Sequence, residues 1–310
     1  MRARVAAALS LAALAACALV VGFSGASFTD STQNPQTVSA VADFLAPTAG
    51  ASVIAKTQGG VTGYVKAEGT YYVYANVTES GNPASGIASV KADVSAITTG
   101  KTAEVLSSGS YTAGGVSYNY RSAQLTAKPT LASGTYSFSA RAVDTAGNES
   151  GPSAGSATVD NGPFKGSGFE TGNVSGGTEG KAEKGDTVTF TFNKAPDPGS
   201  IVSGWDGSGT KSVTVSITDN AANDGLSVGG ATIGSVALKG DYTIGATTFT
   251  GSSMSLSGST VTIVLGTVSG SVKTNTNNTK PVWTPSGSNY DIAGNACSTT
   301  NVTGASAKQF

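Results

Sequence analysis

The sequence predicts an all-β protein in which an N-terminal signal helix is followed by two antiparallel β-sandwich domains in tandem. Apolar and polar residues alternate in many short segments, as they do in half-buried strands. No stretch after residue 30 shows a convincing helical period. A turn of the pattern Asp-x-x-Gly-Asn ends a strand at Asp144–Asn148 and returns at Asp291–Asn295. This repetition in a chain of 310 residues predicts two similar domains.

The composition favours a secreted β-protein and argues against several functions. Gly accounts for 42 residues, and charged residues are only 12% of the chain, against a typical share of about 25%. The net charge of −1 provides no field that would attract nucleic acid. The chain has no histidine, which removes the commonest general base and metal ligand. Its acidic residues lie mainly in turns, so we expect no enzyme and no catalytic residues.

Residues 1–26 have the pattern of a signal peptide. A positively charged start is followed by the apolar run Val5 to Phe23 and by small residues. We expect cleavage between Ala26 and Ser27, with residues 27–40 as a polar spacer. Two alternatives stay open. The apolar run is just long enough to span a bilayer as a retained anchor, and the residues before Cys17 match a lipoprotein processing site.

The junction after the apolar run carries a family resemblance. Ala26 to Asp30 reads small-x-Phe-Thr-Asp, and a polar stretch that contains Asn34 follows. This region resembles the leader of bacterial surface proteins exported with a SipW-type signal peptidase, a group that includes camelysin and TasA-like proteins. The resemblance implies an extracellular or cell-surface location.

Residues 41–160 are expected to form the first domain. Alternating strands are predicted around Tyr71 to Val77, Ala88 to Val94 and Thr135 to Asp144, with Ser153 to Val159 closing the domain. About seven strands in roughly 115 residues is the count of an Ig-like sandwich, and Tyr136 resembles its tyrosine corner. With the Asp-x-x-Gly-Asn turn, this segment resembles bacterial Ig-like domains of surface and adhesin proteins.

Residues 161–166 are expected to form a linker, because Asn161-Gly-Pro163 interrupts regular structure. The second domain then covers residues 167–310. In its clearest strand Val188, Phe190 and Phe192 alternate with threonines. That strand and the following Asp-Pro turn at Asp197 resemble SbsA- and SwmB-type bacterial Ig-like domains.

Two kinds of ligand site come into consideration. Asp144, Asn148 and Glu149, or the loop Asp219 to Asp224, offer oxygen ligands for calcium, although the calcium preference for about six to eight oxygens exceeds what either stretch supplies. A turn held by Asx hydrogen bonds is the favoured interpretation of both. Trp205 lies in a predicted loop, where it could stack on a sugar. We favour a ring that caps the end of a sandwich.

The sequence therefore predicts a non-catalytic secreted or cell-surface protein whose Ig-like modules serve as spacer, adhesion or wall-associated domains. The alternative is an extracellular carbohydrate-binding or carbohydrate-active protein. Its partner would be a surface or matrix protein or a glycan, and membrane contact would involve only the N-terminal segment, if that segment is retained. No cofactor is expected apart from the calcium just considered.

Overall fold

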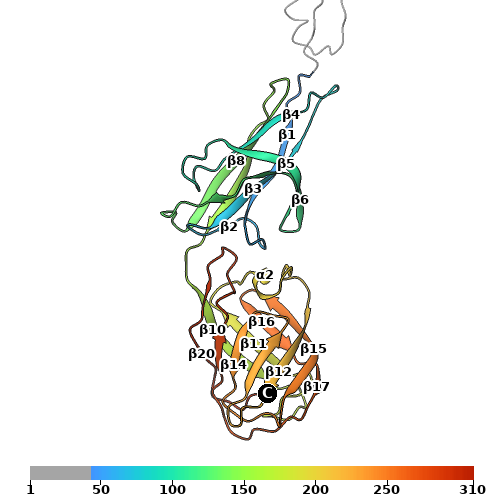
Figure 1. Ribbon diagram of the computed structural model, residues 1–310, viewed down its shortest axis with the longest axis vertical. Helices are drawn as coiled ribbons and strands as arrows, with labels where there is room; N and C mark the ends of the chain where they lie inside the picture. The colour runs from blue at the N-terminus through green and yellow to red at the C-terminus, as the bar shows by residue number, and fades with distance from the viewer. Residues whose placement is uncertain (1–42) are drawn as a thin grey trace, which may run out of the picture.

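The computed structural model describes residues 43–310, which form two lobes placed end to end (Figure 1). The all-β prediction is confirmed, with 49% of residues in strands and 1% in helix. Within residues 43–310 the helical residues form the four-residue helix α2 (Pro198–Ile201). No helix in this part of the chain is long and apolar enough to cross a membrane. The predicted signal peptide, its cleavage site at Ala26 and Ser27, Cys17 and the spacer lie outside the described residues.

The N-terminal lobe, residues 43–159, holds a nine-stranded sheet in the order β1-β3-β6-β5-β4-β8-β9-β2, with β7 paired to β3. All its pairs are antiparallel except β2 with β9. Strand β1, at one end of this order, also contacts β9, near the other end: Ser52 on β1 donates a hydrogen bond to the Ser153 carbonyl on β9 at 3.3 Å. The strands are β1 (Thr48–Lys56), β2 (Tyr64–Val65), β3 (Thr70–Thr78), β4 (Ile87–Asp93), β5 (Glu104–Ala113), β6 (Val116–Ser122), β7 (Leu125–Thr126), β8 (Gly134–Asp144) and β9 (Ser153–Val159).

Strand β3 is central to this lobe because both of its faces are covered. One face carries Tyr71 and Val73 into the main core of the lobe. On the opposite face Tyr74 belongs to a smaller cluster, and beside it the Arg121 guanidinium stacks on the Tyr72 ring, 4.4 Å from its centroid. The expected alternation is therefore present, and aromatic packing also shields the outer face of the strand.

The C-terminal lobe, residues 164–310, holds an eleven-stranded sheet in the order β19-β10-β11-β16-β15-β12-β13-β14-β18-β20, with β17 paired to β15. Its pairs are antiparallel except β10 with β19. The strands are β10 (Phe164–Gly172), β11 (Thr187–Phe192), β12 (Lys211–Thr218), β13 (Gly225–Gly229), β14 (Gly234–Ala237), β15 (Thr247–Ser257), β16 (Thr260–Val264), β17 (Thr267–Ser269), β18 (Val282–Pro285), β19 (Cys297–Ser298) and β20 (Val302–Thr303).

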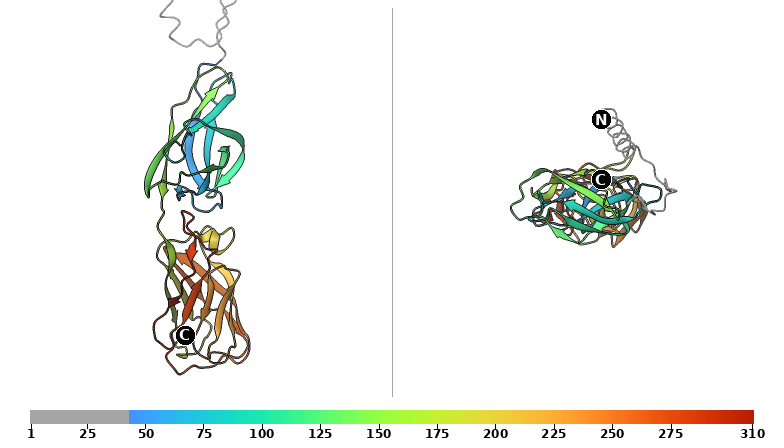
Figure 2. Two further views of the ribbon diagram at one scale, coloured as in Figure 1. Left: turned by 60° about the vertical axis from the view of Figure 1, so that its left-hand side comes forward. Right: turned by 90° about the horizontal axis from the view of Figure 1, so that it is seen from above.

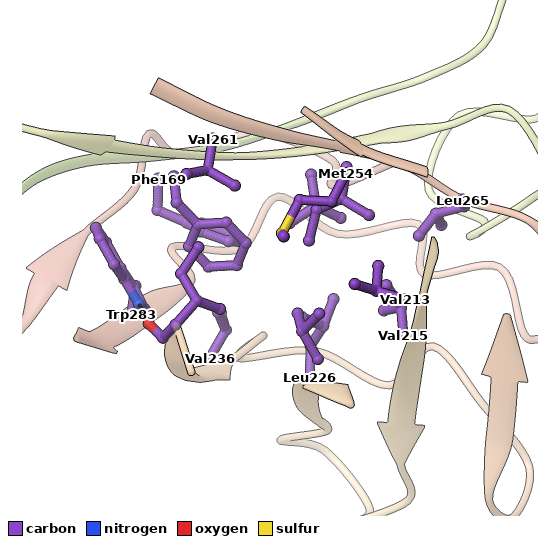
Figure 3. Packing of buried hydrophobic residues seen from close by; sticks show 14 of the residues in the cluster. Phe169, Val213, Val215, Leu226, Val236, Met254, Val261, Leu265 and Trp283 are labelled. Atoms are coloured by element: carbon purple, nitrogen blue, oxygen red, sulfur yellow. Dashed lines mark hydrogen bonds between the residues drawn. The ribbon is translucent and has the colours of Figure 1, made fainter. Parts of the chain in front are cut away.

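Trp283 lies fully buried in the core of the C-terminal lobe, where apolar residues from many strands converge (Figure 3). Its ring packs edge-on against Phe190 at 5.1 Å and Phe192 at 5.2 Å between centroids. Strand β10 begins at Phe164, inside the segment expected to be a linker. The reason is packing: the buried Phe164 ring stacks on Phe192 at 5.0 Å.

The lobes are stacked along the long axis of the molecule, joined by the short connection from β9 to β10 (Figure 2). Helix α2 lies at the end of the C-terminal lobe that faces the N-terminal lobe (Figure 1). Asp43 lies at the opposite, outer end of the N-terminal lobe. The molecule thus presents two regions of interest, the outer end and the junction between the lobes.

Candidate metal centre

Three carboxylates come together at the outer end of the N-terminal lobe. Asp43 precedes β1, Glu79 directly follows β3, and Asp144 ends β8. Strand pairing places Glu79 near the start of β1, because Thr48 lies opposite Thr78 in the β1–β3 register. The Asn148 amide, in the turn after β8, donates to the Asp43 carbonyl and holds this segment beside Asp144. One oxygen of each carboxylate lies within 4.8 Å of one oxygen of the others. Asp43 is 3% and Asp144 1% exposed, so these two side chains are withdrawn from solvent, whereas Glu79 is half-buried.

Backbone N–H groups hold the two aspartates in place. The Asp43 carboxylate accepts hydrogen bonds from the N–H of Leu45 at 3.0 Å and of Ser85 at 2.9 Å. These bonds lower the pKa of Asp43, since they favour its charged form. Asp144 accepts from the N–H of Asn148 at 2.7 Å. Backbone donors therefore fix the positions of both aspartate carboxylates.

Glu79 is the incompletely satisfied member of the cluster. Its Oε1 accepts a hydrogen bond from the Ser80 N–H at 3.0 Å. Its Oε2 is buried and has no hydrogen-bond partner, which is rare for a buried polar atom. Among residues 43–310, none of the three carboxylates forms an ion pair with a lysine or arginine.

The calcium candidates from the sequence are only partly brought together. Asp144 and Asn148 lie at the cluster, and the Asn148 side-chain amide donates to Asp144 Oδ2 at 2.7 Å and to the Asp43 carbonyl at 3.2 Å. Glu149 instead pairs with Arg141 at 3.0 Å, and its side chain is 52% exposed. Sequence reasoning did not assign Asp43 and Glu79 to the site. No local signal marks both residues: Glu79 directly follows β3, but Asp43 lies several residues before the start of β1.

The second calcium candidate, Asp219 to Asp224, has the features of a turn held by hydrogen bonds. Asp224 is fully buried, and its carboxylate accepts from the N–H groups of Asn220, Tyr242 and Thr243 at 3.0, 2.7 and 3.1 Å. Asp219 accepts from the Gly245 N–H at 2.8 Å. These contacts occupy the carboxylates with backbone donors and connect neighbouring loops.

Trp205, the sugar-stacking candidate, is 2% exposed and belongs to the core of the C-terminal lobe. Its indole N–H donates to the Ser208 carbonyl at 2.9 Å. It lines one wall of a cleft of ≈ 480 Å³ between the lobes, opposite Gly114 and Gly115. A ring buried to this degree fits the capping role that the sequence favours, because little of its surface is free to stack on a ligand.

A related arrangement occurs at the junction between the lobes, around the second Asp-x-x-Gly-Asn turn. The ammonium group of Lys194 contacts Asp160 at 2.7 Å and the buried Asp291 at 2.8 Å. It also donates to the Gly162 carbonyl at 2.7 Å. Asn295 repeats the role of Asn148, donating to Asp291 Oδ2 at 2.9 Å and to the Asp160 carbonyl at 2.8 Å. Here a lysine neutralises the carboxylates.

Chemically, the outer cluster can bind a hard cation through oxygen ligands, and the described residues near it offer no nucleophile–base pair. No family model matches the chain, and no curated protein matches it. Its function must therefore be argued from its own residues.

Proposed function

We propose that this chain is a non-catalytic secreted or cell-surface protein whose two Ig-like modules form a stiff spacer. Three features support this proposal. The leader has the pattern of an export signal, and the described residues form two all-β lobes. Tyr136 donates from its hydroxyl to the Ala132 carbonyl at 3.0 Å, close upstream in the chain, as a tyrosine corner does.

The observation that carries the stiffness is a buried ion pair between the lobes. Lys56, at the end of β1, contacts Asp197, beside α2, at 2.5 Å, and their side chains are 2% and 0% exposed. Lys56 also donates to the Ile292 carbonyl at 3.0 Å. Asp197 accepts in addition from the Val61 N–H at 3.3 Å. Such charge-assisted, directional contacts fix relative orientation more than they add stability.

Gly60 allows the two lobes to approach this closely. Its φ is +79°, a conformation that glycine adopts readily. A Cβ at this position would lie 2.1 Å from Asp197 Oδ2. The loop after β1 can therefore pack over the carboxylate only with a glycine here.

Small-angle X-ray scattering of the full chain tests the stiffness. We expect the unaltered chain to fit one extended shape. Lys56→Met leaves Asp197 buried without its partner, so we expect the lobes to separate and the radius of gyration to increase. Lys101→Met is the control, because Lys101 forms an ion pair within the N-terminal lobe and is 41% exposed. Unchanged scattering of Lys56→Met would contradict the proposal.

Location needs a separate test. Intact producing cells should expose the protein to an added protease or antibody, or release it into the medium. Full protection in intact cells, with digestion only after lysis, would show that the chain is not a surface or secreted protein.

A further inference from the structure

We propose that the outer end of the N-terminal lobe binds one Ca²⁺ ion through Asp43, Glu79 and Asp144. The ion would connect the segment before β1 to the loops that follow β3 and β8. This inference goes beyond the spacer function, which requires no ion.

The negative charge of the cluster is not compensated by any ion pair within residues 43–310. Three carboxylates share a small volume, and the described part of the chain supplies them with no cationic side chain. Glu79 is half-buried, and its Oε2 atom is buried without a hydrogen-bond partner. A carboxylate withdrawn from water needs hydrogen-bond donors, a cation or a proton to compensate the lost solvation, and Glu79 Oε2 has no donor. A bound cation would satisfy all three at once.

The junction around the second Asp-x-x-Gly-Asn turn repeats the arrangement of the outer end. Asp43 and Asp160 each precede the first strand of a lobe. Each offers its backbone carbonyl to the asparagine of an Asp-x-x-Gly-Asn turn. Glu79 and Lys194 each follow the strand that pairs with that first strand, β3 with β1 and β11 with β10. The two ends are therefore built on one plan.

At the junction this plan places a positive charge among the carboxylates. The Lys194 ammonium contacts Asp160 and Asp291. At the outer end the corresponding residue is Glu79, so the protein supplies a third carboxylate in place of the ammonium group. The corresponding positive charge must then come from solution.

The ligand set selects the type of cation. All three groups are carboxylates, the chain has no histidine, and the buried Cys297 belongs to the other lobe. Oxygen-only sites suit hard divalent ions. Ca²⁺ accepts about six to eight oxygens in irregular geometry, whereas Mg²⁺ demands a near-ideal octahedron. Three carboxylates on separate loops, completed by water, therefore fit Ca²⁺ better.

Isothermal titration calorimetry of the chelator-treated full chain with CaCl₂ provides the direct test. We expect one Ca²⁺ per chain, weaker binding of Mg²⁺, and a rise in melting temperature on Ca²⁺ addition. Glu79→Gln should weaken Ca²⁺ binding at least about tenfold, as loss of a charged ligand does. Glu149→Gln is the matched control and should bind normally, because Glu149 pairs with Arg141 outside the cluster.

A second variant keeps the test decisive if Glu79→Gln folds poorly. Glu79→Lys would place an ammonium group where the junction has Lys194. We expect this variant to bind no Ca²⁺ and, without Ca²⁺, to melt at or above the temperature of the unaltered apo chain. Failure of the unaltered chain to bind millimolar Ca²⁺ would overturn the proposal. So would equal affinity in Glu79→Gln, or loss of binding in Glu149→Gln.

Discussion

The outer end and the junction of this molecule share a backbone arrangement and differ in charge. In both, a buried aspartate begins an Asp-x-x-Gly-Asn turn, and the asparagine side chain bonds that aspartate and a carbonyl before the first strand. The third position is Glu79 at one end and Lys194 at the other. The Asp-x-x-Gly-Asn turn therefore forms with either a carboxylate or an ammonium group beside it, because its hydrogen bonds involve backbone groups and the asparagine amide.

That difference has consequences for how each end is held. The carboxylates of the junction are neutralised within the protein by Lys194 and by the Lys56–Asp197 pair. The outer end keeps a buried oxygen without a partner. In the spacer that we propose, the lobes are joined by the protein's own residues, and the outer end depends on Ca²⁺.

The largest expected effect comes from converting the junction into a copy of the outer end. Lys194→Glu would bring three carboxylates together: the introduced one, Asp160 and the buried Asp291. We expect the C-terminal lobe to lose roughly 3–5 kcal/mol of stability, the cost of leaving a buried charge unpaired. If the two ends are equivalent, added Ca²⁺ should recover part of this loss. Urea denaturation with and without Ca²⁺ measures both effects.

Lys273→Glu is the control for charge reversal, because Lys273 pairs with Asp241 on the surface and its side chain is 47% exposed. Exposed pairs contribute less than about 1 kcal/mol, so this change should be small and insensitive to Ca²⁺. A loss in Lys194→Glu no larger than in the control would show that Lys194 does not neutralise the junction.

Acid titration next tests how Lys194 compensates the charge of the junction. Burial alone would raise the pKa of Asp160, but hydrogen bonds from Lys194 and the Gly162 N–H outweigh it and lower that pKa. The folded state therefore binds fewer protons than the unfolded state near the pKa of a free aspartate. The stabilisation is complete above about pH 4 and is lost as the pH falls through the lowered pKa.

We accordingly expect the stability of the C-terminal lobe to fall below about pH 4, with a shallower decline in Lys194→Met, where the main cause of the shift is removed. Denaturation midpoints between pH 2 and 6 provide the measurement. Identical acid profiles for the two proteins would contradict the assigned role of Lys194. Its own pKa is raised: burial lowers it, but Asp160 and Asp291 outweigh that effect. Lys194 therefore stays protonated throughout this range, and only strong alkali removes its charge.

The sequence predicts the strands and the turns well, because their causes are local. Val188, Phe190 and Phe192 alternate with threonines and are buried as expected, and the second turn repeats the bonds of the first. The cluster could not be predicted in the same way. Glu79 follows β3 and Asp144 ends β8, two strands that are not neighbours in the sheet, so the two residues meet through the tertiary arrangement of the lobe, and no local pattern marks that.

Residues next to a motif were misleading for the same reason. Glu149 lies beside Asn148 in the chain, yet its side chain points to Arg141. Trp205 lies in a Gly- and Ser-rich segment that left sugar stacking as an alternative, and its ring is buried, as the favoured capping role requires. In both cases tertiary packing decides where the side chain lies. The sequence shows only which residues are neighbours along the chain.

The smallest expected effect tests the equivalence itself. Asn148→Ala removes two bonds of 2.7 and 3.2 Å, and Asn295→Ala removes two of 2.9 and 2.8 Å. Each change should cost about 1–2 kcal/mol, as expected for the net loss of hydrogen bonds to a carboxylate and a carbonyl. Since the frameworks match, the two costs should be similar in the absence of Ca²⁺.

Amide hydrogen exchange of the two turns measures these costs locally, which avoids assuming that both lobes unfold together. Gly147 and Gly294, with φ of +92° and +95°, should lose protection to a similar extent in the respective variants. Asn277→Ala, at an exposed position, serves as the control and should leave both turns unchanged. A cost confined to one turn would mean that the two frameworks are not equivalent. Glu79 and Lys194 would then no longer correspond, and the Ca²⁺ proposal would rest on the buried carboxylates alone.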